Sequence, residues 1–229
     1  MQGLHDFVPT RLKIEYINQL LKVGFDTIDF GSFVSPKAIP QMKDSAEVLN
    51  GLDLDNSPSK LLAIVANKRG AEDAAAFEEI DVLGFPFSIS EEFQQRNTGS
   101  SIDQSFGRVE EIQNICEKTG KTLLIYISMA FGNPYGEAWD PEIAVNWSQR
   151  LHAELGIEVF ALSDTIGVSD KKSIQNMFKA VTSELPELEF GAHLHSNPNV
   201  AMEKTIAAYE AGCRRFDGLK NICMILTIL

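Results

Sequence analysis

The stretch Leu188-Glu189-Phe190-Gly191-Ala192-His193-Leu194-His195 alternates in character from one residue to the next. Successive side chains on a β-strand point to opposite faces. One face of this predicted strand is apolar (Leu188, Phe190, Ala192 and Leu194) and is expected to meet outer helices. The other face carries His193 and His195 near the end of the strand. The pattern predicts a strand with one face against helices and the other turned into a barrel.

Strand-like and helix-like stretches alternate on both sides of this segment. Six more strands are predicted, at residues 27–30, 61–66, 81–88, 122–130, 158–164 and 214–217. Thr10, Asp44 and Ser101 are predicted to cap three of the helices. Repeated βα units indicate a parallel sheet. A strand before Thr10 would make eight, so the predicted fold is an α/β TIM (β/α)8 barrel, incomplete because its first strand and last helix are missing.

An open, doubly wound sheet is the alternative fold. No GxGxxG turn follows the first predicted strand, which makes a dinucleotide-binding version of that sheet less favoured. No linker or low-complexity stretch divides the 229 residues, so we predict one domain.

Composition and charge narrow the functional classes. The net charge of −12 argues against a nucleic-acid surface. No apolar run approaches the roughly 20 residues needed to cross a bilayer, and the N-terminus lacks a signal-peptide pattern. Three cysteines without CxxC spacing (Cys116, Cys213 and Cys223) favour a reduced, cytoplasmic setting.

Polar residues gather where several predicted strands end. His193 and His195 lie at the end of the sheet where barrel enzymes have their active sites, and two imidazoles on one face can bind the same divalent ion. The alternative is a pair of hydrogen-bonded core histidines. Other polar residues at this end are Asp29, Asp164, Thr165, Tyr126 and Ser128. Each alone would also suit a helix cap or a loop hydrogen bond, but their concentration favours a functional site.

The loop Ser32-Phe33-Val34-Ser35-Pro36-Lys37 follows the first predicted strand. Lys37 and the backbone amides of this loop would suit an anionic ligand. A solvated surface loop is the alternative.

Four motifs resemble hydroxymethylglutaryl-CoA lyases: Val8-Pro9-Thr10, the loop at 32–37 followed by Pro40-Gln41-Met42, Asp164-Thr165-Ile166-Gly167-Val168, and His193-Leu194-His195. The resemblance runs from Gln2 to Gly218, which predicts a lyase-type domain at 1–218 and a non-matching apolar tail at 219–229. The resemblance implies metal-dependent retro-Claisen cleavage of 3-hydroxy-3-methylglutaryl-CoA to acetyl-CoA and acetoacetate, with Mg²⁺ or Mn²⁺ as the metal and an acyl-CoA as the substrate. It also implies a homodimer.

The resemblance implies a role for each matching residue. His193 and His195 match the metal ligands, and Asp29 and Asp164 match catalytic carboxylates, with Asp29 standing where the family commonly has glutamate. The residues expected to bind substrate are Gln2, Ser32, Lys37, Tyr126, Ser128 and Thr165. The histidine strand is also shared with isopropylmalate and homocitrate synthases, so an acetyl-CoA-dependent condensing enzyme is the alternative.

The match breaks at both ends. The family has an Arg-Asp pair just before the segment that matches Met1, and a Gly-Gly-Cys-Pro loop after the last strand; Cys223 lacks that setting. We therefore expect an unpaired sheet edge, a polypeptide that folds poorly or associates, and weak metal binding. A non-catalytic remnant is a third interpretation of the chain.

Overall fold

The structure, a computed structural model, describes residue 4, residues 6–219 and residues 225–228. The chain divides into two compact units. The first comprises Met1–Gly84, Ile115–Thr122 and Asp217–Leu229, and the second comprises Phe85–Asn114 and Leu123–Phe216.

Helices and strands alternate along the chain as the sequence predicts. The first unit contains α1 (Thr10–Leu21), β1 (Thr27–Ser32), the 3-10 helix η1 (Pro40–Met42), α2 (Ser45–Asn50), β2 (Lys60–Ile64), α3 (Lys68–Ala75) and β8 (Ile225–Ile228). The second contains α4 (Glu91–Thr98), α6 (Pro141–Leu155), β5 (Val159–Asp164), α7 (Lys171–Glu184), β6 (Glu189–Leu194) and α8 (Pro198–Glu210). Residues of both units contribute to β3 (Val82–Ser88), α5 (Ile102–Thr119), β4 (Thr122–Ser128) and β7 (Arg215–Leu219).

All seven predicted strands are present, with ends shifted by a few residues. The short helix α4 was not predicted. The Oγ of Ser90 accepts a hydrogen bond from the Phe93 amide and caps this helix. No helix among the described residues is both long and apolar enough to span a bilayer.

In the first unit, parallel pairing joins β1 to β2 and β2 to the start of β3. The register between β1 and β2 shifts between Asp29 and Gly31, which is the signature of a β-bulge. We expected an unpaired sheet edge beside β1. Instead, β8 pairs antiparallel with β1 through Thr27 and Thr227 and through Ile28 and Leu226. That expectation was wrong because an apolar run in the predicted tail supplies backbone partners for the edge.

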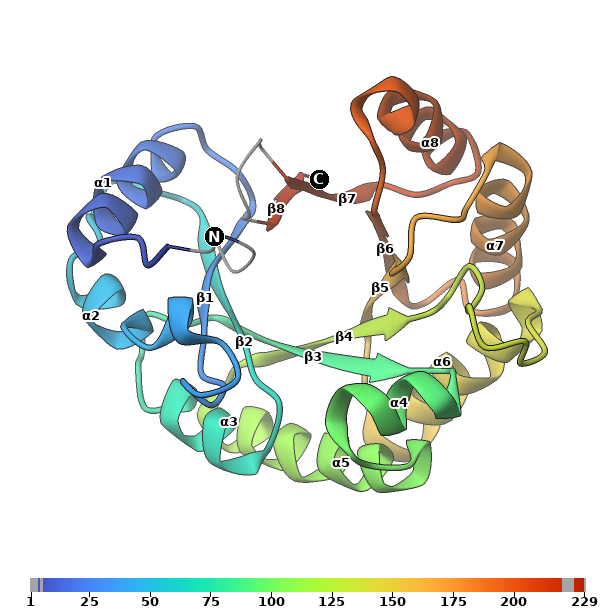
Figure 1. Cartoon of the computed structure of the whole chain (residues 1–229), viewed down its shortest axis with the longest axis horizontal. Coiled ribbons are helices and arrows are strands. Elements are labelled where there is room, and N and C mark those ends of the chain that lie inside the picture. The colour runs from blue at the N-terminus through green and yellow to red at the C-terminus, as the bar shows by residue number, and fades with distance from the viewer. Residues whose placement is uncertain (1–3, 5, 220–224, 229) are drawn as a thin grey trace. The chain divides into compact units, whose positions relative to one another are not determined.

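In the second unit, β4, β5, β6 and the start of β7 pair in parallel and in that order. Helices α7 and α8 pack against each other and against β6, as Figure 1 shows in orange and red. The apolar face of β6 is buried, with Phe190 stacked on Phe160 at a ring-centroid distance of 5.4 Å and Ala192 also buried. Leu194 on the same face is only half-buried and Gly191 on the opposite face is buried, so the alternation of residue types is reflected only in part in the burial of β6.

Of the three predicted helix caps, Ser101 is confirmed, Asp44 holds the N-cap position of α2 without a side-chain cap hydrogen bond, and Thr10 was wrong. Thr10 is the first residue of α1 rather than its cap, and its Oγ1 donates to Asp44 Oδ2 at 2.8 Å. The Asp44 side chain makes no cap hydrogen bond to α2, because Lys13 Nζ occupies its other oxygen at 2.6 Å. Ser101 does cap its helix, since its Oγ accepts the Gln104 amide at 3.1 Å.

Candidate active site

The two histidines at the end of β6 lie next to each other. The ring centroids of His193 and His195 are 5.3 Å apart and the ring planes are inclined by 55°. His193 is half-buried and His195 is exposed. Their spacing on one face of the strand fits two nitrogen ligands to one divalent ion.

A backbone carbonyl fixes the ring of His195. The Nδ1 atom of His195 lies 2.9 Å from the carbonyl oxygen of Thr165. Because a carbonyl oxygen can only accept, Nδ1 must carry the proton, and the lone pair of a neutral ring is then on Nε2. Metal-binding histidines usually have their second nitrogen held in this way. The Thr165 hydroxyl is also engaged, because its Oγ1 accepts the Met129 amide at 2.9 Å.

The ring of His193 packs edge-on against Tyr126, at a centroid distance of 5.3 Å and an interplanar angle of 79°. Tyr126 and Ser128 are both buried at the end of β4. The second unit therefore holds six of the predicted site residues: Tyr126, Ser128, Asp164, Thr165, His193 and His195.

Asp164 is buried and both of its carboxylate oxygens are occupied. Oδ1 accepts the Val168 amide at 2.9 Å. Oδ2 accepts the amide and the hydroxyl of Ser169, at 3.1 and 2.5 Å, and pairs with Lys204 Nζ at 2.8 Å. These bonds hold the loop that carries Thr165. The catalytic role expected of Asp164 stays a prediction.

Lys204 was not singled out from the sequence. It lies on the buried face of α8 with Ala207 and Ala208. A lysine at such a helical position is the signal that would have identified it, because ammonium groups are rarely buried without a partner.

The first unit holds Asp29 at the bulge of β1. Loss of water around its carboxyl group, reinforced by the negative charge of Asp217, raises the pKa of Asp29 to about 8. The Gly31 amide donates to this carboxyl group and opposes the rise. Asp29 therefore changes charge near neutral pH, as groups that transfer protons in enzymes often do.

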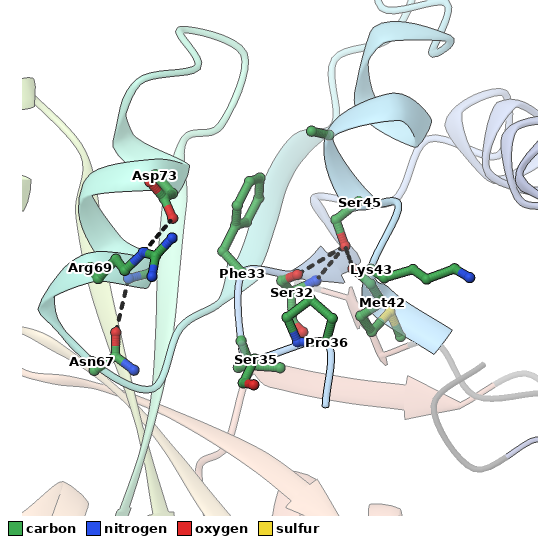
Figure 2. Close-up of a pocket in the computed structure, with 13 residues that line it drawn as sticks. Ser32, Phe33, Ser35, Pro36, Met42, Lys43, Ser45, Asn67, Arg69 and Asp73 are labelled. Atoms are coloured by element: carbon green, nitrogen blue, oxygen red, sulfur yellow. Dashed lines mark hydrogen bonds and ion pairs between the residues drawn. The ribbon is translucent and has the colours of Figure 1, made fainter. Parts of the chain in front are cut away.

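Residues 32–36 line a pocket of about 390 Å³ in the first unit. Figure 2 shows Ser45 bonded to the backbone of Ser32, and Asn67 and Arg69 on the opposite side of Phe33. Within the described part of the chain, the buried Oγ of Ser32 has no hydrogen-bond partner. Lys37 is exposed and does not line this pocket.

Gln2 and Cys223 lie outside the described residues. Cys116 and Cys213 are buried free thiols. In the loop after β4, Asn133 Oδ1 accepts the amides of Tyr135 and Glu137, so it organises that loop. Among the described residues, no cluster of three or more His, Cys, Asp or Glu is arranged to hold a metal ion. His193 and His195 supply two imidazoles, which is only part of the ligand set of a divalent ion.

Similarity to known proteins extends over nearly the whole chain. Residues 1–220 match the HMGL-like family model. The chain is 32% identical over 217 residues to the cytoplasmic 3-hydroxy-3-methylglutaryl-CoA lyase of Rattus norvegicus, covering 95% of this chain and 62% of that protein. The chain thus spans less than two thirds of the length of that relative.

Two solved structures are similar throughout most of the chain. The HMG-CoA lyase of Bacillus subtilis is 30% identical with a TM-score of 0.88, over 95% of this chain and 72% of the other. An HMG-CoA lyase from Acinetobacter baumannii, in complex with coenzyme A and 3-methylmalate, is 30% identical with a TM-score of 0.86, over 95% of this chain and 70% of the other. Together with the parallel strand pairing inside each unit, this likeness confirms the predicted TIM-barrel fold class.

Proposed function

Because the chain belongs to the HMGL-like family, we propose that it cleaves 3-hydroxy-3-methylglutaryl-CoA to acetyl-CoA and acetoacetate. Relatives at about 30% identity carry the lyase name, and the solved structure of one of them is in complex with coenzyme A. The condensing-enzyme alternative is not favoured by these relatives.

One observation carries the proposal within the chain itself. His193 and His195 lie side by side, and the Thr165 carbonyl holds the His195 ring with Nε2 available as a ligand. We assign these two imidazoles to a divalent ion, Mg²⁺ or Mn²⁺. When bound, such an ion polarises substrate oxygen atoms and favours the alkoxide of the tertiary hydroxyl group.

The proton-transfer role is proposed for Asp29. Cleavage requires loss of the hydroxyl proton, after which the carbon–carbon bond breaks and the acetyl-CoA enolate takes up a proton. A carboxyl group with a pKa of about 8 is a stronger base than an ordinary aspartate and still titrates near neutral pH. Its elevated pKa supports this role.

The substrate-binding roles remain proposals. The unpartnered hydroxyl of Ser32 beside the pocket supports a polar contact to the substrate. Lys37, Tyr126, Ser128 and Thr165 are proposed to line the acyl-CoA site, with Asp164 as a further catalytic-site carboxylate. A cytoplasmic location is proposed by analogy with the cytoplasmic lyase of Rattus norvegicus. A homodimer is proposed from the family resemblance alone.

An acetoacetate assay tests the proposed reaction. Purified chain is incubated with 3-hydroxy-3-methylglutaryl-CoA and Mg²⁺, and acetoacetate is measured by coupled NADH oxidation. We expect turnover that His193→Ala and His195→Ala abolish. His152→Ala is the matched control, because His152 Nδ1 also lies 2.9 Å from a backbone carbonyl, that of Ile157, at the end of α6. Absence of acetoacetate from the unmodified chain, or full turnover by His193→Ala, would overturn the proposal.

A further inference from the structure

The buried lysine of α8 connects two motifs of the candidate site. Lys204 is 5% exposed, and its Nζ lies 2.8 Å from Asp164 Oδ2, 3.1 Å from the carbonyl oxygen of His195 and 3.4 Å from that of Gly167. We propose that Lys204 is a positioning residue that holds His195 in place for metal binding. This inference rests on the proposed metal site at His193 and His195.

The three contacts account for the burial of a charged group. Removing an ammonium group from water costs several kcal/mol unless a counter-charge and hydrogen-bond acceptors replace the lost water. An ammonium group has three donors, and here one anionic and two neutral oxygens surround it. Neighbouring positions on the same buried face of α8 are alanines. An apolar residue at 204 would avoid the desolvation cost, so packing alone does not explain the lysine.

The acceptors show what the lysine organises. Asp164 is the last residue of β5, Gly167 lies in the loop that follows it, and the third acceptor is the backbone of His195 itself. The same loop contacts the ring of His195 through the Thr165 carbonyl. His195 is therefore fixed to one loop at two points, its backbone through Lys204 and its ring through Thr165.

This double attachment has a consequence for metal affinity. His195 is the residue after the last residue of β6 and is exposed, so its position is not determined by the strand ladder or by core packing. Without Lys204, the chain after β6 would lose its tie to Asp164. The ring would then sample more orientations, and metal binding would have to restore the productive one. Losing an outer-shell partner typically weakens metal affinity about 10- to 100-fold.

Manganese titration tests the proposal without depending on turnover. Lys204→Met keeps an unbranched side chain, one heavy atom shorter, and removes its charge. We expect the Kd for Mn²⁺, measured by electron paramagnetic resonance, to rise about 10-fold or more. Lys121→Met is the matched control. Lys121 Nζ likewise donates to two backbone carbonyls, of Phe77 at 2.7 Å and Ile80 at 2.5 Å. We expect it to lower Tm and leave the Kd unchanged.

A second variant separates positioning from folding. Lys204→Met leaves Asp164 buried without its counter-charge, so Lys204→Met/Asp164→Asn should recover Tm while Mn²⁺ affinity stays weak. A wild-type Kd in folded Lys204→Met would overturn the inference. Failure of both variants to fold would assign Lys204 to folding and also overturn it. Failure of the unmodified chain to bind Mn²⁺ would instead refute the metal site of the proposed function.

Discussion

The carbonyl oxygen of Thr165 and the Nδ1 atom of His195 are joined by a 2.9 Å hydrogen bond across 30 residues of sequence. This bond links two sequence motifs, Asp164–Val168 and His193–His195. The loop determines which nitrogen of His195 carries the proton, and therefore which one is free to bind a metal.

Gly167→Ala is expected to weaken metal binding through this loop. Gly167 has φ of +72°, and a Cβ there would lie 3.4 Å from the His195 carbonyl oxygen. A side chain at such a φ costs about 1–2 kcal/mol, and a change of the loop backbone that relieves this strain would move the Thr165 carbonyl relative to His195. We expect a several-fold higher Kd for Mn²⁺ and a lower Tm.

Gly156→Ala is the control for that prediction. Gly156 has a similar φ of +69°, at the end of α6, but an added Cβ would have no atom within 4 Å. It should lower Tm by a comparable amount, with Mn²⁺ affinity unchanged. Equal effects of the two substitutions on affinity would contradict a role for the loop in orienting His195.

Asp29 is expected to make the protein less stable as pH rises. Its pKa is about 8 in the folded state and about 3.9 in an unfolded chain. Between these values the folded state binds the extra proton, so the free energy of unfolding falls as pH increases through this window and levels off above about pH 8. Asp29→Asn cannot ionise and should lack this contribution.

The effect of Asp29 is measured by urea unfolding in the absence of divalent ions. The free energy of unfolding is compared at about pH 5.5, inside this window, and at about pH 8.5, above it. The stability of Asp29→Asn relative to the unmodified chain should increase from the lower to the higher pH. Parallel pH profiles for the two proteins would show that the carboxyl group titrates normally.

The strands could be predicted from sequence because their signals are local. Alternation along residues 188–195 identified the strand and placed Phe190 and Ala192, both buried, on one face of β6. The pairing of β8 with β1 could not be predicted in this way, because an apolar run does not reveal its partner strand. The failed caps have a similar cause. Thr10 and Asp44 have the residue types of caps, but the buried Lys13, distant in sequence from Asp44, competes for the carboxylate.

The candidate site was predictable where side chains carry the chemistry and not where the backbone does. His193, His195 and Asp164 stand out by residue type. The Thr165 carbonyl that holds His195 leaves no mark in the sequence, because every residue has a carbonyl group. Lys204 did leave a mark, as a lysine on the buried face of α8, but its partners come from the end of β5 and from the residue after β6.

The buried pair of Lys13 and Asp44 is expected to stabilise the first unit strongly. Their N–O distance is 2.6 Å and their side chains are 4% and 6% exposed. Lys13→Met would leave the Asp44 carboxylate buried without its counter-charge, at a cost of about 3–5 kcal/mol in the free energy of unfolding. Chemical denaturation measures this loss.

The exposed pair of Arg11 and Glu15 on the same helix provides the comparison. Its side chains are 87% and 52% exposed, so Glu15→Gln should leave the free energy of unfolding essentially unchanged. If Lys13→Met lowered the free energy of unfolding as little as Glu15→Gln does, the Lys13 pair would be effectively solvated.

Two glycine substitutions should change the free energy of unfolding in opposite directions. The difference tests how the loop after β1 is supported. Gly70 lies in the first turn of α3, where an added Cβ would be 2.2 Å from the Phe33 carbonyl oxygen. Because that atom is backbone, Gly70→Ala must push the loop at 32–37 away from the helix, at a cost of about 1–3 kcal/mol. Gly107 lies inside α5 with no atom within 4 Å of an added Cβ, so Gly107→Ala should stabilise by about 0.5–1 kcal/mol.

The same pair of variants tests whether this loop binds substrate. If Ser32 and Lys37 contact the acyl-CoA, displacement of their loop should raise KM for 3-hydroxy-3-methylglutaryl-CoA in Gly70→Ala at temperatures where the variant is fully folded. Gly107→Ala should retain the original KM, because α5 carries none of the proposed site residues. A raised KM in Gly70→Ala alone assigns the loop to the substrate, since a purely structural loop would lower Tm and leave KM unchanged.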